Sequence, residues 1–163
     1  MSKERVDLMF KKYLIVFLIS MVPLIELRGA IPYAIGFHLP LLLSYIIAIL
    51  GNMLPVPFIF LFARKVLLWG KDKKVIGNFF GFCLEKGEKV GLKLGSDGRG
   101  LYIALLLFVG IPFPGTGAWT GTLAASILNM DFKKSSLAVM GGVILAGIIM
   151  GVLSLGIFRG ILG

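Results

Sequence analysis

The lengths of four apolar segments constrain the fold of this chain most strongly, because only two of them can cross a bilayer. A spanning helix needs about 20 mostly apolar residues. Leu39–Ala63 and Leu137–Phe158 reach this length, whereas Tyr13–Ile25 and Leu101–Ile111 do not. Each short segment runs into a stretch rich in proline and glycine, which interrupts helices. We therefore expect two full spans and two broken helical segments.

Composition and charge place the chain in a membrane. Hydrophobic residues make up 58% of the 163 residues, against roughly 45–50% in soluble domains. Most charged residues lie in three islands, at 1–12, 64–99 and 131–134, while Glu26 and Arg28 interrupt an apolar stretch. We expect an integral, multi-pass protein of the cell (plasma) membrane.

Several function classes are excluded by what the chain lacks. One cysteine, Cys83, and one histidine, His38, exclude an internal disulfide and a Cys/His metal site. Catalysis by a serine or cysteine would need His38, which we interpret as an interfacial residue. We expect no enzyme, cofactor or metal. We also expect no nucleic-acid partner, because the net charge of +9 comes from residues that flank membrane segments. The first apolar run lacks a cleavage site and is expected to be retained.

The two halves of the chain follow the same order of elements, which predicts an internal repeat. Shifting the first half by 88 residues places Gly29 on Gly117. We expect one membrane domain over 1–163, in which repeat 1 covers 13–63, a basic linker covers 64–100 and repeat 2 covers 101–158. Paired, interrupted hydrophobic segments point to a transporter site near the midplane.

The two long spans carry residues that predict how they pack. Pro55 and Pro57 should bend the first span, because proline removes a backbone donor. The second span carries Ala138-x3-Gly142 and a similar pair at 147 and 151, a spacing that allows close helix contact. We expect a homodimer with this span as one candidate contact, since so few spans hardly enclose a substrate path alone.

The linker at 64–100 carries nine Lys/Arg and four Asp/Glu residues. The positive-inside rule places it in the cytoplasm. Part of it, including Val75, Phe79 and Cys83, shows helical periodicity with lysines along the apolar face. This pattern indicates an amphipathic helix in the headgroup region, and a solvated loop is the alternative.

The second break, "GIPFPGTGAWTG", has the features of an anion receptor. Pro112 and Pro114 stop the incoming helix, and Gly115 and Gly117 can adopt conformations that other residues avoid. Thr116 adds a hydroxyl. A helix that restarts near residue 118 would present unpaired N–H groups and the positive end of its dipole.

The first break, "ELRGAIP", places Glu26 and Arg28 where neither can face lipid cheaply. Arg28 suits phosphate or carboxylate. Partial desolvation favours the neutral form of a carboxyl, so Glu26 is a candidate proton carrier. The alternative is a salt bridge that only pins the broken helix. Trp119 is either an interfacial anchor or a lining residue. The predicted substrate or ion site comprises Glu26, Arg28, Gly29, Pro32, Pro112, Pro114, Gly115, Thr116, Gly117 and Trp119.

"ELRGAIP" followed by a basic linker and "GIPFPGTGAWTGTLAA" resembles the small multi-drug export proteins of bacteria and archaea, over 13–158. That family is itself similar to the DedA (VTT) superfamily, which has two opposed re-entrant hairpins. The resemblance implies a transporter. Glu26 and Arg28 match the first motif of the family. Four residues match the second motif, namely Pro112, Pro114, Gly115 and Gly117. This motif lacks the acidic residue that many DedA proteins have there.

Two topologies stay open. The broken segments either cross the membrane, with both termini cytoplasmic, or re-enter from opposite faces, with both termini outside. The positive charges near the N-terminus favour the first, whereas the short segments and the resemblance favour the second. The expected fold is an all-α integral membrane protein with two inverted repeats joined by an amphipathic interfacial helix, each repeat being a broken (re-entrant) helical hairpin followed by a full transmembrane helix.

Three functions compete. The first is a proton-coupled secondary transporter of the small multidrug-export type for an amphipathic substrate. The second is a flippase for an anionic lipid carrier such as a polyprenyl phosphate, and the third is a non-transporting membrane scaffold. Expected partners are membrane lipids, the substrate and a second copy of the chain.

Overall fold

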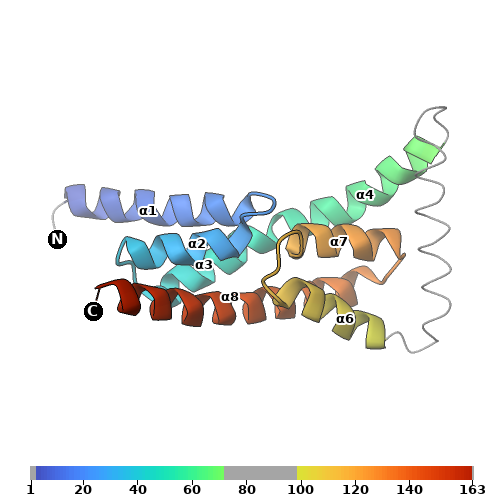
Figure 1. Ribbon diagram of the computed structural model, residues 1–163. Helices are drawn as coiled ribbons and strands as arrows, with labels where there is room; N and C mark the ends of the chain where they lie inside the picture. Colours follow the sequence, from blue (N-terminus) through green and yellow to red (C-terminus); the bar gives the residue numbers. More distant parts are fainter. Residues whose placement is uncertain (1–2, 72–98, 163) are drawn as a thin grey trace.

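The computed structural model describes residues 3–71 and 99–162, and helices joined by short turns make up this part of the chain (Figure 1). The predicted all-α class is confirmed for these residues. The proposed interfacial helix falls largely on residues 72–98, outside the described residues. The helices are α1 (Lys3–Met21), α2 (Glu26–Gly36), α3 (Leu41–Met53), α4 (Pro55–Lys71), α6 (Arg99–Gly110), α7 (Ala118–Ile127) and α8 (Phe132–Leu162).

Within the described residues, two helical stretches are long and apolar enough to cross a membrane, as predicted. They are Leu41–Ala63, formed by α3 and α4, and Phe132–Ile157 within α8. The first is interrupted at Leu54, immediately before Pro55. Proline is well tolerated at the first position of a helix, so it begins α4 where α3 has ended.

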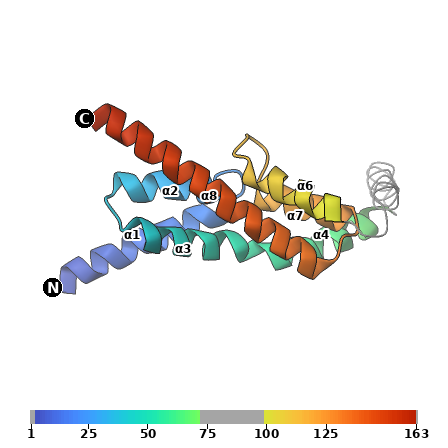
Figure 2. The same ribbon diagram turned by 90° about the horizontal axis from the view of Figure 1, so that it is seen from below.

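The remaining helices form two hairpins that extend from opposite ends of the molecule (Figures 1 and 2). The hairpin of α1 and α2 begins where both chain termini lie, which we call the termini end. The hairpin of α6 and α7 begins where α4 stops, which we call the linker end. Both turns, at 22–25 and 111–117, lie near the middle of the molecule, whereas α8 runs from one end to the other.

The first break lies earlier in the chain than the sequence predicted. The motif "ELRGAIP" is helical, because α2 begins at Glu26 and contains Pro32. The irregular segment is 22–25, where Pro23 follows the end of α1. The expectation that the first break falls within "ELRGAIP" was therefore wrong. The second restart is confirmed, since α7 begins at Ala118.

Glycines allow the long helices to pack closely on the first arm of each hairpin. A Cβ atom added at Gly51 would lie 2.6 Å from the carbonyl oxygen of Phe17, and one added at Gly142 would lie 2.6 Å from that of Leu106. Gly147 in turn packs against the Tyr45 ring. Gly142 and Gly147 are thus buried within the subunit.

The turn between α2 and α3 has the same geometry as the turn between α7 and α8. His38 and Asn129 both adopt left-handed backbone conformations, with φ of 53° and 56°. The next N–H in each turn donates to the carbonyl five residues earlier, at 2.9 Å and 3.0 Å. The step from His38 to Asn129 is 91 residues, not the 88 expected. In this register Glu26 corresponds to Gly117.

Candidate functional site

The carboxylate of Glu26 is buried where the two hairpin turns meet. Only 4% of this residue is exposed. Its Oε2 accepts a hydrogen bond from the backbone N–H of Ala118 at 3.2 Å, and its Oε1 accepts one from Trp119 at 3.1 Å. Both donors belong to the first turn of α7. The first N–H groups of a helix have no partner within it, and the helix dipole favours a negative charge there.

The backbone N–H groups at the start of α7, predicted to receive an anion, bind a carboxylate of the same chain. Gly117 leaves the space for this carboxylate. A Cβ atom added at Gly117 would lie 2.7 Å from the carboxyl carbon of Glu26. Its backbone, with φ of 149° and ψ of −173°, is also one that only glycine adopts easily.

The guanidinium of Arg28 binds the end of α6 and the loop that follows. It donates to the carbonyl of Phe113 at 2.7 Å and to those of Val109 and Ile111 at 3.2 Å each. It also donates to Thr116 Oγ1 at 3.0 Å. The last carbonyls of a helix lack partners within it, and a cation there is favourable for the dipole. Arg28 thus caps the C-terminal end of α6.

The indole of Trp119 makes the equivalent contact from α7 to the end of α1. Its Nε1–H donates to the carbonyl of Met21, the last residue of α1, at 3.1 Å. Trp119 and Arg28 are 91 residues apart, the same step that relates the two turns. Each second helix therefore sends a donor side chain to the end of the opposite hairpin's first helix. We call Glu26, Arg28, Thr116, Gly117 and Trp119 the tip contact.

A comparison with known families matches this part of the chain. Residues 26–149 match the model of a family described as "Putative small multi-drug export protein". The chain belongs to this family. No curated protein and no solved structure matches it. Family membership indicates a membrane transporter rather than an enzyme.

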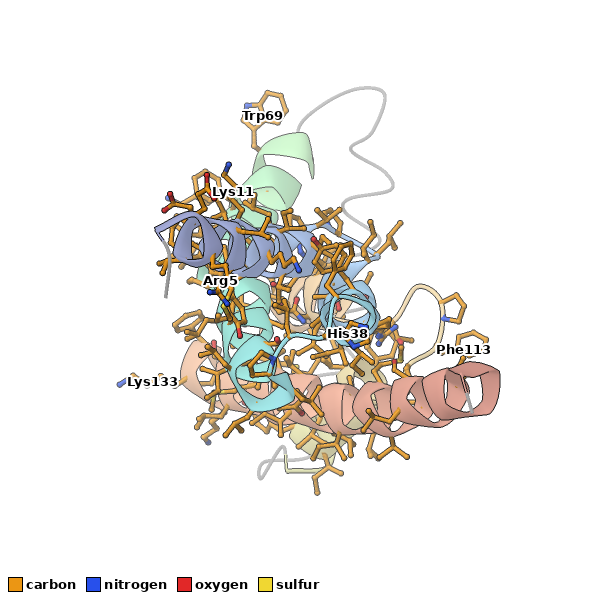
Figure 3. The ribbon with its side chains drawn as sticks, turned by 90° about the vertical axis from the view of Figure 1, so that its left-hand side faces the viewer. Arg5, Lys11, His38, Trp69, Phe113 and Lys133 are labelled. Carbon is orange, nitrogen blue, oxygen red and sulfur yellow. The ribbon has the colours of Figure 1, made fainter. Side chains whose placement is uncertain are left out.

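The other predicted site residues lie around the tip contact without joining it. Gly29 is half-buried and packs against the Ile25 side chain, and Pro32 is half-buried within α2. Pro114 and Gly115 are exposed on the outer part of the loop, and Pro112 is half-buried. Gly115 has a φ of 85° and no atom within 4 Å of an added Cβ. Figure 3 shows Phe113 of this loop at the edge of the molecule.

Two buried polar side chains lie outside the tip contact, and one of them, Asn52, was not predicted from the sequence. Asn52 on α3 and Thr122 on α7 are 2% and 1% exposed. Asn52 Oδ1 and Thr122 Oγ1 are among the buried atoms without a hydrogen-bond partner within the described residues. An asparagine inside a membrane span was the available signal. Within residues 3–71 and 99–162, no cluster of His, Cys, Asp or Glu is suited to hold a metal ion.

Proposed function

We propose that this protein is a proton-coupled secondary transporter that exports an amphipathic compound, and that Glu26 carries the proton. One observation carries the proposal: the carboxylate of Glu26 is buried at the junction of two broken hairpins, held by backbone N–H groups. A charge so costly to place in a membrane is retained most readily where it marks a substrate or ion path.

The proposed membrane arrangement has both hairpins re-entrant. Irregular backbone within a bilayer is tolerated only where protein or a wet cavity surrounds it. At about 1.5 Å per residue, the 11 residues of α2 span about 17 Å, roughly half of a 30 Å hydrocarbon core. Two half-length hairpins from opposite ends would meet near the midplane (Figure 1). The linker at 64–100 would be cytoplasmic and both termini would lie outside.

We further propose that the halves are inverted repeats. The matching turns at His38 and Asn129 support this, as do the exchanged contacts of Arg28 and Trp119. The packing supports it as well, because α2 lies on α8 of the other half while α7 lies on α4. Such repeats allow a transporter to alternate by rocking one half against the other.

Protonation of Glu26 would weaken the junction in a defined way. The neutral carboxyl loses its charge and part of its acceptor capacity, so it binds the start of α7 less strongly. The two hairpins could then separate on one side of the membrane. Deprotonation would restore the contact, which couples proton movement to opening.

The flippase alternative has its own supporting observation. Once Glu26 leaves, the N–H groups of Ala118 and Trp119 are free beside the guanidinium of Arg28. Backbone N–H groups at a helix start together with arginine suit a phosphate. The substrate would then be an anionic lipid carrier such as a polyprenyl phosphate. A homodimer remains part of this proposal, with α8 available beyond residue 151, where added Cβ atoms at Gly156 and Gly160 meet no other atom.

The test uses the purified protein in proteoliposomes, with a cationic dye and a polyprenyl phosphate as separate substrates. Each is assayed with and without a pH gradient. Glu26→Gln should abolish the response to the gradient, because an amide does not titrate, whereas Glu26→Asp should retain it. Unchanged pH-dependent transport by Glu26→Gln would remove Glu26 from the mechanism. If the wild type moves neither substrate while the variants change only expression, the scaffold alternative is favoured.

A further inference from the structure

The two hairpins differ in the space between their arms. Between α6 and α7 lies an apolar cleft of about 230 Å³, lined in part by Ala104, Phe108, Ala124 and Met130. The arms of the first hairpin, α1 and α2, pack more closely together than α6 and α7 do. The hairpins occupy equivalent places in the two halves, so the difference calls for a cause in their side chains.

The side chains at equivalent positions of the two hairpins differ in size, and this difference accounts for the space between α6 and α7. Gly51 packs on Phe17 as Gly142 packs on Leu106, so α1 and α6 correspond with a shift of 89 residues. Ala104 therefore corresponds to Ile15. With the shift of 91 that relates the second arms, Ala124 corresponds to Tyr33. Isoleucine and tyrosine stand in the first hairpin where the second has two alanines. The smaller side chains at these two positions leave space for a cleft once α6 and α7 are packed together.

The cleft is closed at both ends and open at its side. Towards the turn, Gly121 packs directly against Val109, so the two arms touch there. Towards the linker end, the backbone N–H of Asp131 donates to the Tyr102 hydroxyl at 3.3 Å, which joins the two arms again. Between these points Phe108 is 42% exposed. In the membrane arrangement proposed above, this open side faces lipid.

The size and the charges around the cleft indicate what it would hold. An apolar cavity of roughly 150 Å³ accommodates one benzene ring, so 230 Å³ has room for a ring system slightly larger than that. Met130 lines the cleft and is followed by the exposed carboxylate of Asp131. The negative end of the α7 dipole lies at the same end. The Lys134 ammonium lies over the Tyr102 ring at 5.9 Å and lines a separate groove.

We propose that the cleft between α6 and α7 binds the ring system of a lipophilic organic cation that enters sideways from the bilayer, with its charge beside Asp131. The inference rests on the proposed function only in naming this cation as an export substrate. Binding itself requires no transport.

Equilibrium binding to the full-length protein in lipid nanodiscs tests the site. The probe is (1-naphthylmethyl)trimethylammonium, a two-ring cation. Ala124→Trp should fill the cleft and weaken saturable binding about tenfold or more. The matched control is Leu123→Trp, the preceding residue on α7, whose side chain is 42% exposed and lies outside the cleft lining. This control should bind within about twofold of wild type.

A second variant, Ala104→Trp, provides the same test if Ala124→Trp fails to fold. Ala104→Trp fills the cleft from α6 at an exposed position, where the backbone has no need to move. It should weaken binding as Ala124→Trp does. Unchanged probe affinity in either folded variant would overturn the cleft as the site. Because the readout is binding, a lack of transport would count against the proposed function alone.

A further variant tests whether the ligand of the cleft is a cation. Asp131→Asn removes the charge and keeps a side chain able to cap α8, as the aspartate does through its Oδ1 at 2.9 Å from the Lys134 N–H. Affinity for the cation should fall about threefold to tenfold, and naphthalene-1-sulfonate should bind more weakly than the cation. Equal affinity for both ions, or no effect of Asp131→Asn, would overturn the assignment of a cation.

Discussion

At the scale of single residues, the protein keeps a buried carboxylate by giving it backbone partners. Glu26 receives two N–H groups from α7 and also adopts a left-handed backbone conformation, with φ of 52°. Such a conformation costs a non-glycine residue about 1–2 kcal/mol. Strain of this kind persists where the surrounding structure holds it, and it is frequent at functional sites. The hydrogen bonds from α7 and the bond from the Glu26 N–H to the carbonyl of Val22 both hold Glu26 in place.

The space left by Gly117 leads to a prediction. Gly117→Ala should destabilise the protein by about 1–3 kcal/mol, because its backbone conformation excludes a side chain and the new Cβ would collide with Glu26. Adding Glu26→Asp should recover part of the loss, since the shorter side chain withdraws the carboxylate. Thermal unfolding in detergent measures both effects.

Gly115→Ala is the matched control for this pair. Gly115 also has a positive φ, yet no atom lies within 4 Å of its added Cβ. Its substitution should therefore cost only the backbone strain, and Glu26→Asp should not rescue it. Strict additivity of Gly117→Ala and Glu26→Asp would contradict a steric coupling between the two residues.

At the scale of elements, each half supplies the cap for the other half's broken helix. Arg28 on α2 closes the end of α6, and Trp119 on α7 closes the end of α1. Helix ends inside a membrane cannot rely on water for their unpaired groups. Each hairpin turn is therefore completed by the other, which would allow two short, broken helices to lie inside a bilayer in the re-entrant arrangement proposed above.

The cap on α6 can be tested by a change that keeps the charge. Arg28→Lys retains a cation but offers one nitrogen in place of the fork that reaches four acceptors. The loss should be about 1–3 kcal/mol locally. Hydrogen exchange followed by mass spectrometry should show faster exchange at 109–117.

Trp119→Phe provides the comparison for Arg28→Lys. It removes the indole N–H that binds Met21, so faster exchange should appear at the end of α1 and the turn at 22–25. An exposed change, Arg5→Lys, should alter neither region. The same exchange pattern in Arg28→Lys and Trp119→Phe would contradict separate caps.

At the scale of the whole molecule, each end of the helix bundle carries a lysine packed on an aromatic ring. Lys12 lies over the Phe37 ring near the termini end, and Lys134 lies over the Tyr102 ring near the linker end. Figure 3 views the molecule from the termini end, where it shows Arg5, Lys11 and His38. Amphipathic and aromatic side chains of this kind favour the two membrane surfaces.

The re-entrant arrangement proposed above predicts on which side of the membrane each end of the molecule lies. The only cysteine, Cys83, reports the linker, and Lys3→Cys in a Cys83→Ser background reports the termini end. A membrane-impermeant maleimide should label Lys3→Cys in intact cells and should label Cys83 only after permeabilisation. If both positions lie on the same side, each hairpin crosses the membrane completely and the re-entrant arrangement fails.

The sequence by itself determined the helical class, the two long spans, the interruption at Pro55 and the restart of α7 at Ala118. These features depend on local properties, namely apolar length, proline chemistry and the conformational freedom of glycine. Sequence also drew attention to Glu26, Arg28 and Gly117 because charges and glycines in an apolar run are conspicuous. The identity of the family follows from the same stretch of chain.

Only the tertiary structure decided which groups meet. The partners of Glu26 and Arg28 are mainly backbone N–H and C=O groups, which every residue carries, so no sequence pattern marks them. The register of 91 residues and the helical state of "ELRGAIP" also emerged only from the packed structure, because a proline within α2 suggests a break when read locally. The cleft between α6 and α7 depends on which alanines face each other across two helices, and that is settled by packing over long distances in the chain.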